Sequence, residues 1–173
     1  MNGLFGYEDE QAHYDTAQVC RNGHVINGSF HSSPEFNQNF CDKCGEATVI
    51  ACSSCAAEIR GDYKSPDAMV ITGHRPPAPN YCHNCGQPYP WTQKRLTLAR
   101  ELADEFDELD SSDKEKLKGT LDDLVKDSPK TDLATGRFKK IMAKVGKDSY
   151  DAMRRIITDI ISETAKKTLF PEQ

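Results

Sequence analysis

The chain lacks an apolar run near the roughly 20 residues that a helix needs to cross a bilayer. Its first residues, MNGLFGYEDEQAHYD, carry acidic side chains where a secretory signal requires basic ones, and they contain no apolar core. We therefore expect a cytoplasmic protein without a membrane span. The content of 37% hydrophobic and 28% charged residues is ordinary for a folded soluble protein.

The common catalytic motifs are missing as well. The sequence contains no glycine-rich phosphate loop, no HExxH segment and no nucleophile elbow. Without a named catalytic constellation, we expect a binding module rather than an enzyme.

Cysteine does not occur in the second half of the chain. From Trp91 onward there are only three Gly and two Pro, while Leu, Lys, Asp and Ala recur at helical spacing. The first half is rich in Cys, Gly, Pro, Asn and aromatic residues, with short apolar stretches at Ala47 to Ala51 and Ala68 to Thr72 that favour short strands. We predict an α+β protein with a small β module in residues 1–90 and a helical domain in residues 91–173.

Apolar periodicity predicts four helices in the second half. Thr92 is the expected N-cap of the first helix, Ser112 and Glu115 form a capping-box pair for the second, Gly146 caps the end of the third, and the fourth begins after Asp148. We expect all four apolar stripes to pack into the core of a small bundle. The stripes are Leu98, Leu102, Phe106 and Leu109; Leu117, Leu121, Leu124 and Val125; Phe138, Ile141, Met142 and Val145; and Tyr150, Met153, Ile156, Ile157, Ile160 and Ile161.

The seven cysteines point to metal rather than to disulfides. Seven is an odd number, and six of the seven fall into three CxxC pairs, FCDKCG, ACSSCA and YCHNCG. In a reducing cytosol such pairs are kept as thiols. Two residues between thiolates let one turn direct both sulfurs at the same ion, about 2.3 Å away for zinc, and the following Gly45 or Gly86 accepts unusual backbone angles.

The remaining cysteine, in CRNGH, supplies a fourth ligand pair with a histidine. Sequential pairing of the four pairs predicts two structural zinc ions, the first held by three cysteines and a histidine and the second by four cysteines. A cross-braced pairing fits the same spacing, and His31 is an alternative to His24 for the first site. The predicted ligands are Cys20, His24, Cys41 and Cys44 for the first ion, and Cys52, Cys55, Cys82 and Cys85 for the second.

Both predicted sites are closed. Catalytic zinc sites usually keep one position open for water, whereas a complete set of four Cys and His ligands leaves none. An enzyme with a partly open first site, in which Cys20 acts as nucleophile beside His24, remains an alternative.

A family resemblance supports this architecture. The segments TAQVCRNGH, FCDKCG, EIRGDY and YCHNCGQPYPW, with the later RFKK and DIISETAKK, resemble an uncharacterised family of small bacterial proteins over most of the chain. The resemblance implies a double zinc ribbon followed by a helical tail. It implies metal binding but no activity, and it is compatible with binding either protein or nucleic acid.

Charge separates the candidate partners. Residues 1–90 hold ten acidic and five basic residues, a formal charge of −5. Because nucleic-acid affinity depends on Lys and Arg releasing counterions from phosphates, such a ribbon is a poor generic binder of nucleic acid. The helical half is neutral, but its cations gather between residues 137 and 155. We expect this basic stretch to be a solvated face that complements the acidic first helix, with nucleic acid, an anionic lipid surface or an acidic partner as alternatives. Its candidate contact residues are Arg137, Lys139, Lys140 and Lys144.

Aromatic residues and prolines surround the last CxxC pair, in HRPPAPNYCHNCGQPYPW. We expect Tyr81, Tyr89 and Trp91 to seal the junction between the two halves, with a partner-binding surface as the alternative. The sequence as a whole predicts an interaction or regulatory adaptor with two structural zinc ions. A nucleic-acid-binding protein that uses residues 137–155 is the main alternative.

Overall fold

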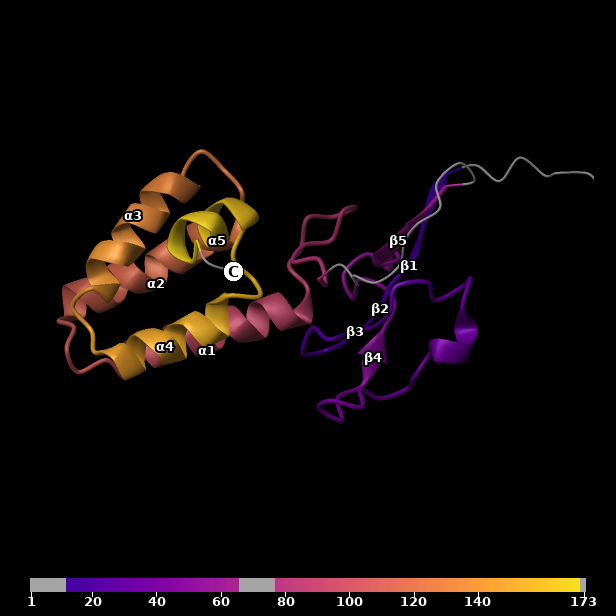
Figure 1. The fold of residues 1–173 in the computed structure, drawn as a ribbon, viewed down its shortest axis with the longest axis horizontal. Helices are drawn as coiled ribbons and strands as arrows, with labels where there is room; N and C mark the ends of the chain where they lie inside the picture. Colours follow the sequence, from indigo (N-terminus) through magenta and orange to yellow (C-terminus); the bar gives the residue numbers. More distant parts are fainter. Residues whose placement is uncertain (1–11, 66–76, 172–173) are drawn as a thin grey trace, which may run out of the picture. The chain divides into compact units, whose positions relative to one another are not determined.

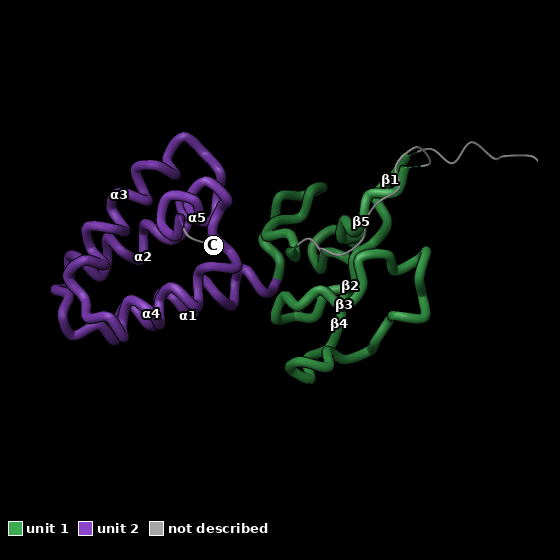
Figure 2. Tube along the Cα trace, viewed as in Figure 1, with its two compact units in different colours: residues 1–89 green, residues 90–173 purple. Residues whose placement is uncertain are grey.

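The computed structural model describes residues 12–65 and 77–171. The predicted strand at Ala68 to Thr72 and the start of the proline-rich segment, His74 to Pro76, lie outside the described residues. The chain divides into two compact units, Met1–Tyr89 and Pro90–Gln173 (Figure 2). Small antiparallel sheets in the first unit and helices in the second confirm the predicted α+β class.

Two small sheets form the first unit, which we call the ribbon unit (Figure 1). One sheet has two strands in the order β1–β5, and the other has three in the order β3–β2–β4. All pairings are antiparallel. The strands are β1 (His13–Thr16), β2 (Gln18–Cys20), β3 (Val25–Asn27), β4 (Thr48–Val49) and β5 (Arg60–Lys64), and a short 3₁₀ turn, η1 (Pro34–Phe36), follows β3.

Buried polar contacts join the loop after β3 to the two-stranded sheet. The carboxylate of Asp15 accepts hydrogen bonds from the backbone N–H groups of His31 and Ser32, and the Ser29 hydroxyl donates to Asp62 at 2.7 Å. The backbones approach so closely that a Cβ atom on Gly61 would lie 2.1 Å from the carbonyl oxygen of Gly28. Only glycine fits there, since real Cβ atoms do not approach other atoms so closely.

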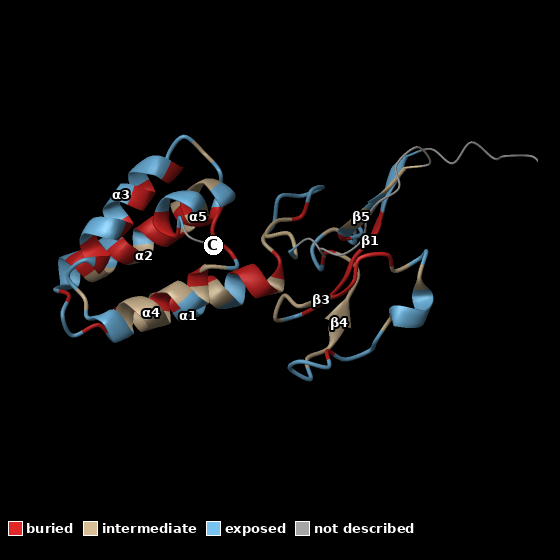
Figure 3. Cartoon of the chain, in the orientation of Figure 1, coloured by how far each residue is buried: buried red, intermediate tan, exposed pale blue. Residues whose placement is uncertain are grey.

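The second unit, the helical unit, contains five described helices rather than the predicted four. In this unit α2 packs against α1 and α3, α4 packs against α1, and α5 packs against α3 (Figure 1). Its core includes the fully buried Leu117, Leu121, Leu124, Phe138, Met153 and Ile157 (Figure 3). The helices are α1 (Pro90–Asp104), α2 (Ser111–Val125), α3 (Thr131–Met142), α4 (Lys147–Ile157) and α5 (Glu163–Leu169).

The predicted fourth helix is split because a serine starts a new one. The Ser162 side chain caps α5 by accepting from the backbone N–H of Ala165, and the Ser162 N–H donates to the carbonyl of Leu124. Ile160 and Ile161 remain buried in the link between α4 and α5. Apolar periodicity therefore continues through the break and hides it in the sequence.

Four predicted helix ends were wrong, including the start of the fourth helix, which begins at Lys147 rather than after Asp148. Pro90 starts α1, since proline suits the first turn, and Thr92 lies inside the helix. The N-cap of α2 is Asp110, whose carboxylate accepts from the N–H of Asp113, rather than the pair at Ser112 and Glu115. Helix α3 ends at Met142, and Gly146 is the N-cap of α4, with φ −66° and ψ 163°.

The buried face of α1 also differs from the predicted stripe. Leu98 is 51% exposed and Leu102 is half-buried, whereas Leu96, Ala99 and Ala103 face the core. The small alanine side chains allow a close approach of neighbouring helices, and α1 has two of them, α2 and α4. None of the helices in the described part of the chain has the length and apolar content of a membrane span.

Two substitutions, one at the N-cap of α2 and one inside this helix, test the assigned bounds of α2. Asp110→Ala removes the capping carboxylate and should lower the free energy of unfolding of the helical unit by about 1 kcal/mol. Gly119→Ala should raise it by up to about 1 kcal/mol, since a Cβ at this exposed helical position meets nothing within 4 Å. Urea unfolding followed by circular dichroism at 222 nm measures both. An Asp110→Ala variant as stable as the parent would contradict the assigned cap.

Candidate metal centres

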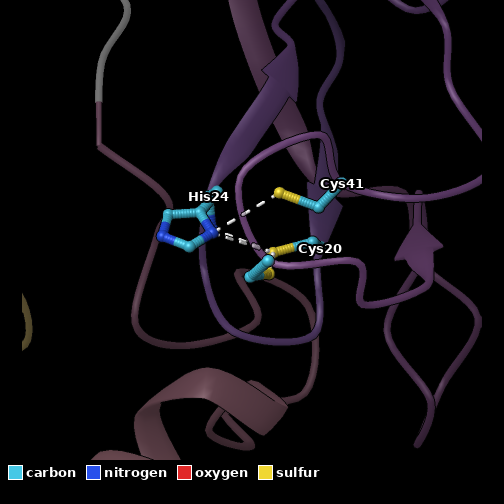
Figure 4. Close-up of side chains that lie close together, drawn as sticks. Cys20, His24 and Cys41 are labelled. Atoms are coloured by element: carbon cyan, nitrogen blue, oxygen red, sulfur yellow. Dashed lines mark hydrogen bonds between the residues drawn. The ribbon is translucent and has the colours of Figure 1, made fainter.

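The first ligand group lies where β2 turns into β3. Cys20 ends β2, and Gly23, at φ 90°, lets the turn bring His24 back toward Cys20. The Nδ1 atom of His24 lies 3.5 Å from the sulfurs of both Cys20 and Cys41 (Figure 4). The sulfurs of Cys20 and Cys44 are 3.8 Å apart. A tetrahedral ion with sulfur ligands at 2.3 Å requires a sulfur–sulfur distance of about 3.8 Å, so the arrangement has the dimensions of a metal site.

The second group has the same dimensions. The sulfurs of Cys52 and Cys85, and those of Cys55 and Cys82, are each 3.7 Å apart. In both groups all four ligand atoms lie within 4.8 Å of one another. The described residues bring together no third group of three or more His, Cys, Asp or Glu ligand atoms.

The three CxxC turns share one backbone pattern. In each, the first cysteine carbonyl accepts from the residue four positions later, and its N–H donates to the residue five positions later. The residue that donates its N–H to the first cysteine's carbonyl has a positive φ, 70° at Gly45, 59° at Ala56 and 71° at Gly86. Ala56 adopts this left-handed conformation without the freedom of glycine, which costs about 1 kcal/mol or more. The two backbone hydrogen bonds of the CxxC turn in ACSSCA therefore form despite the conformational strain at Ala56.

Ligand pairing follows the sequential scheme rather than the cross-braced one, since neighbouring pairs meet in each group. The imidazole of His31 does not join the first group. Its Nε2 atom lies 3.2 Å from Oε1 of Glu58, at the surface of the ribbon unit.

Hydrogen bonds, burial and the close spacing of the thiols shift their pKa values, and a bound cation would favour the thiolate form of all of them. Hydrogen bonds from the backbone of Glu46 and then from Asn22 lower the pKa of Cys44 to about 6, and backbone hydrogen bonds from Cys85 and Asn84 lower the pKa of Cys82 to about 6. Burial raises the pKa of Cys20. A backbone hydrogen bond from Gln87 favours the Cys85 thiolate, but desolvation and the thiols of Cys55, Cys82 and Cys52 raise its pKa to about 12. Thiols this close to one another cannot all ionise, because the resulting thiolates would repel. A divalent cation would stabilise all the thiolates together.

Asparagines and a tyrosine support the ligands, a role that sequence analysis missed. Asn22 donates its amide to Cys44, and Asn84 donates its amide to Cys55, each at 3.5 Å and each from the other ligand pair of the same site. The Tyr89 side chain is hydrogen-bonded to Cys82. Burial and the neighbouring thiols, Cys82 first, raise the pKa of the tyrosine, so its hydroxyl keeps the proton. An Asn within a ligand turn was the signal available in the sequence.

The predicted contact residues fall into two classes. Tyr89 and Trp91 are buried and Tyr81 is half-buried, so none presents an exposed ring. Arg137, Lys139 and Lys140 are exposed on α3 and form no ion pair with the described residues, whereas Lys144 forms one with Asp113 in the first turn of α2. Among the described residues, no ion pair joins the predicted basic stretch to α1.

Comparison with known protein families matches residues 13–169 to a family described as an uncharacterized protein conserved in bacteria (DUF2321). The match spans most of the chain and confirms the resemblance seen in its sequence motifs. The chain belongs to this family. No curated protein and no solved structure matches it.

Removal of metal should unfold the ribbon unit and spare the helices. About 90 residues with few large apolar side chains bury little core, and a structural metal contributes on the order of 10 kcal/mol to folding. After treatment with a strong chelator, hydrogen exchange followed by mass spectrometry should lose protection in residues 13–64 and keep it in residues 91–169. Ribbon protection that survives verified metal removal would contradict the account.

A pair of histidine variants tests the ligand assignment. His24→Ala removes the nitrogen ligand of the first group, so native mass spectrometry should show one metal per chain in place of two. His31→Ala, the matched control, should retain two because its ring lies against Glu58 and Phe30 and is not part of the ligand group. Loss of metal in the His31 variant alone would reverse the assignment.

Proposed function

We propose that this family member is a zinc-stabilised interaction adaptor, in which two closed zinc sites hold a small folded surface that binds another protein. The observation that carries the proposal is the completeness of both ligand sets. Each set offers four nitrogen or sulfur atoms within 4.8 Å of one another, enough to fill a tetrahedral shell. In an adaptor, such closed sites stabilise the fold and take no part in a reaction.

The donor atoms favour zinc over the other common divalent ions. Seven sulfurs and one imidazole nitrogen make up the two sets, and neither contains an oxygen ligand. Calcium and magnesium prefer oxygen, while tetrahedral sulfur sites with or without histidine are typical of zinc and of iron–sulfur proteins. Residues Cys20, His24, Cys41 and Cys44 would hold one ion, and Cys52, Cys55, Cys82 and Cys85 the other.

Closed coordination speaks against catalysis at either site. A hydrolytic zinc needs a bound water, and four protein ligands leave no position for one. The alternative nucleophile, Cys20, is buried and has its sulfur 3.3 Å from the backbone N–H of His24, inside the ligand group itself. A buried ligand thiol has no access to a substrate.

Charge favours a protein partner for the ribbon unit. Its residues carry a formal charge of −5 before metal is counted. With zinc bound, three thiolates leave the first site at −1 and four leave the second at −2, so the metal does not reverse the sign. The exposed cations Arg137, Lys139 and Lys140 on α3 are the specific observation that favours nucleic acid as a second candidate.

Partner binding should depend on the zinc sites and not on α3. A partner trapped by photo-crosslinking in cells and purified should form a complex with the zinc-loaded chain, measured by titration calorimetry. The variant with Cys82→Ser and Cys85→Ser should lose this complex, because its second site cannot close, while the control with Arg137→Glu and Lys140→Glu should keep it. A complex that survives loss of zinc contradicts the proposal. Salt-sensitive binding to duplex DNA that only the α3 variant abolishes would assign the nucleic-acid function instead.

A further inference from the structure

A pocket of about 250 Å³ lies beside the first metal site. Its walls come from three consecutive parts of the ribbon unit: β3 contributes Val25 and Ile26, η1 contributes Glu35 and Phe36, and the CxxC turn contributes Asp42 and Lys43. The ligand His24 also lines it. Because the metal fixes both the turn before β3 and the CxxC turn, it also fixes two of the three walls.

One wall of the pocket is an exposed aromatic ring. Phe36 is 59% exposed, as are Tyr14, Phe40 and Tyr63 to a comparable degree among the described residues of this unit, but of these four rings Phe36 alone lines this pocket. Val25, which is half-buried, also lines the pocket. The pocket therefore offers apolar surface that is open to a ligand.

The pocket also carries unbalanced negative charge. The carboxylates of Glu35 and Asp42 form no hydrogen bond or ion pair with any described residue, and both side chains are exposed. The first metal site adds a formal charge of −1 when zinc is bound. Lys43 is the single cation of the lining, so the local balance is negative.

We propose that this pocket binds a lysine or arginine side chain of the partner protein, a proposal that rests on the adaptor function and names the partner's chemistry. Small-molecule sites usually have volumes of about 300–1,000 Å³, and this pocket is smaller and open. A long basic side chain matches its two properties, since the methylene stem packs on Phe36 and Val25 while the cationic head meets Glu35 and Asp42. The aromatic face of Phe36 adds attraction for a cation.

A second pocket in the same unit has similar residues, but its carboxylates and its aromatic ring already have partners within the chain. It is larger, about 340 Å³, and also contains an aromatic ring, Tyr14, and two carboxylates, Asp15 and Glu58. Those carboxylates already accept hydrogen bonds, Glu58 from Thr16 and Asp15 from backbone N–H groups. The guanidinium of Arg60 already lies 5.1 Å from the centre of the Tyr14 ring. Of these two pockets, the one beside the first metal site is the one whose carboxylates have no hydrogen bond or ion pair with the described residues.

The test uses short capped peptides and the zinc-loaded full chain. The probes are Ac-Gly-Ala-Arg-Ala-Gly-NH₂, its lysine counterpart, and a control in which citrulline, the neutral isostere, replaces arginine. In two-dimensional ¹⁵N–¹H NMR titrations, the arginine and lysine peptides should shift the amides of residues 24–26 and 35–43, and the citrulline peptide should not. The double variant Glu35→Gln and Asp42→Asn should weaken binding about tenfold, the effect of losing two exposed charge contacts.

Matched controls separate this pocket from general charge effects. Glu101→Gln with Asp127→Asn makes the same charge change in the helical unit and should leave peptide affinity unchanged. All variants should retain two metals per chain. Equal binding of the citrulline peptide, shifts outside residues 24–43, or full affinity in the pocket variant would overturn the proposal. The zinc-dependent complex with a partner would still form in that case. The two experiments therefore distinguish a failure of the pocket proposal from a failure of the adaptor proposal.

Discussion

The structure of the ribbon unit depends on thiolates that repel one another unless a cation lies between them. Without metal, backbone hydrogen bonds lower the pKa of Cys82 to about 6. At Cys85 the backbone hydrogen bond of Gln87 is outweighed by desolvation and the neighbouring thiols, which raise the pKa to about 12, so the group keeps part of its protons. Two divalent ions would convert this repulsion into eight ligand bonds, four at each site, distributed from Cys20 to Cys85. Strands of only two to five residues could not hold these loops together.

This constraint also shapes the surface available to a partner. The residues between the ligand pairs, such as those from Val25 to Phe40, contain short strands and turns whose ends the metal sites fix. They can therefore expose charged and aromatic side chains without the unit losing its fold. The helical unit is different, because it has its own apolar core and ion pairs such as Arg100 with Asp122 at 2.7 Å. Metal would hold the ribbon unit together through its eight ligand side chains, whereas burial of apolar side chains holds the helical unit.

How much the sequence could predict follows from the range of each interaction. The CxxC knuckles were predictable because two ligands three residues apart need only one turn. Spacing could not decide between sequential and cross-braced pairing, because both satisfy every local turn. The sequence predicted Tyr89 at the junction or at a partner surface. Its hydrogen bond to Cys82 could not be predicted, because the two side chains meet only in the folded unit. In the helical unit, periodicity located the apolar residues but not the break before Ser162, since Ile160 and Ile161 stay buried across it, and the exposure of Leu98 depends on which neighbours α1 packs against.

The central claim is that both metal sites are closed by protein ligands, and zinc K-edge X-ray absorption on the purified chain tests it most directly. Two ions that share seven sulfurs and one nitrogen give an average first shell of about 3.5 sulfur and 0.5 nitrogen atoms, with sulfur at about 2.3 Å and no oxygen. That result would establish two complete structural sites. An oxygen ligand in the shell would contradict the account, because it would mean that one ion keeps a position open for water and that Cys20 or His24 is available for chemistry.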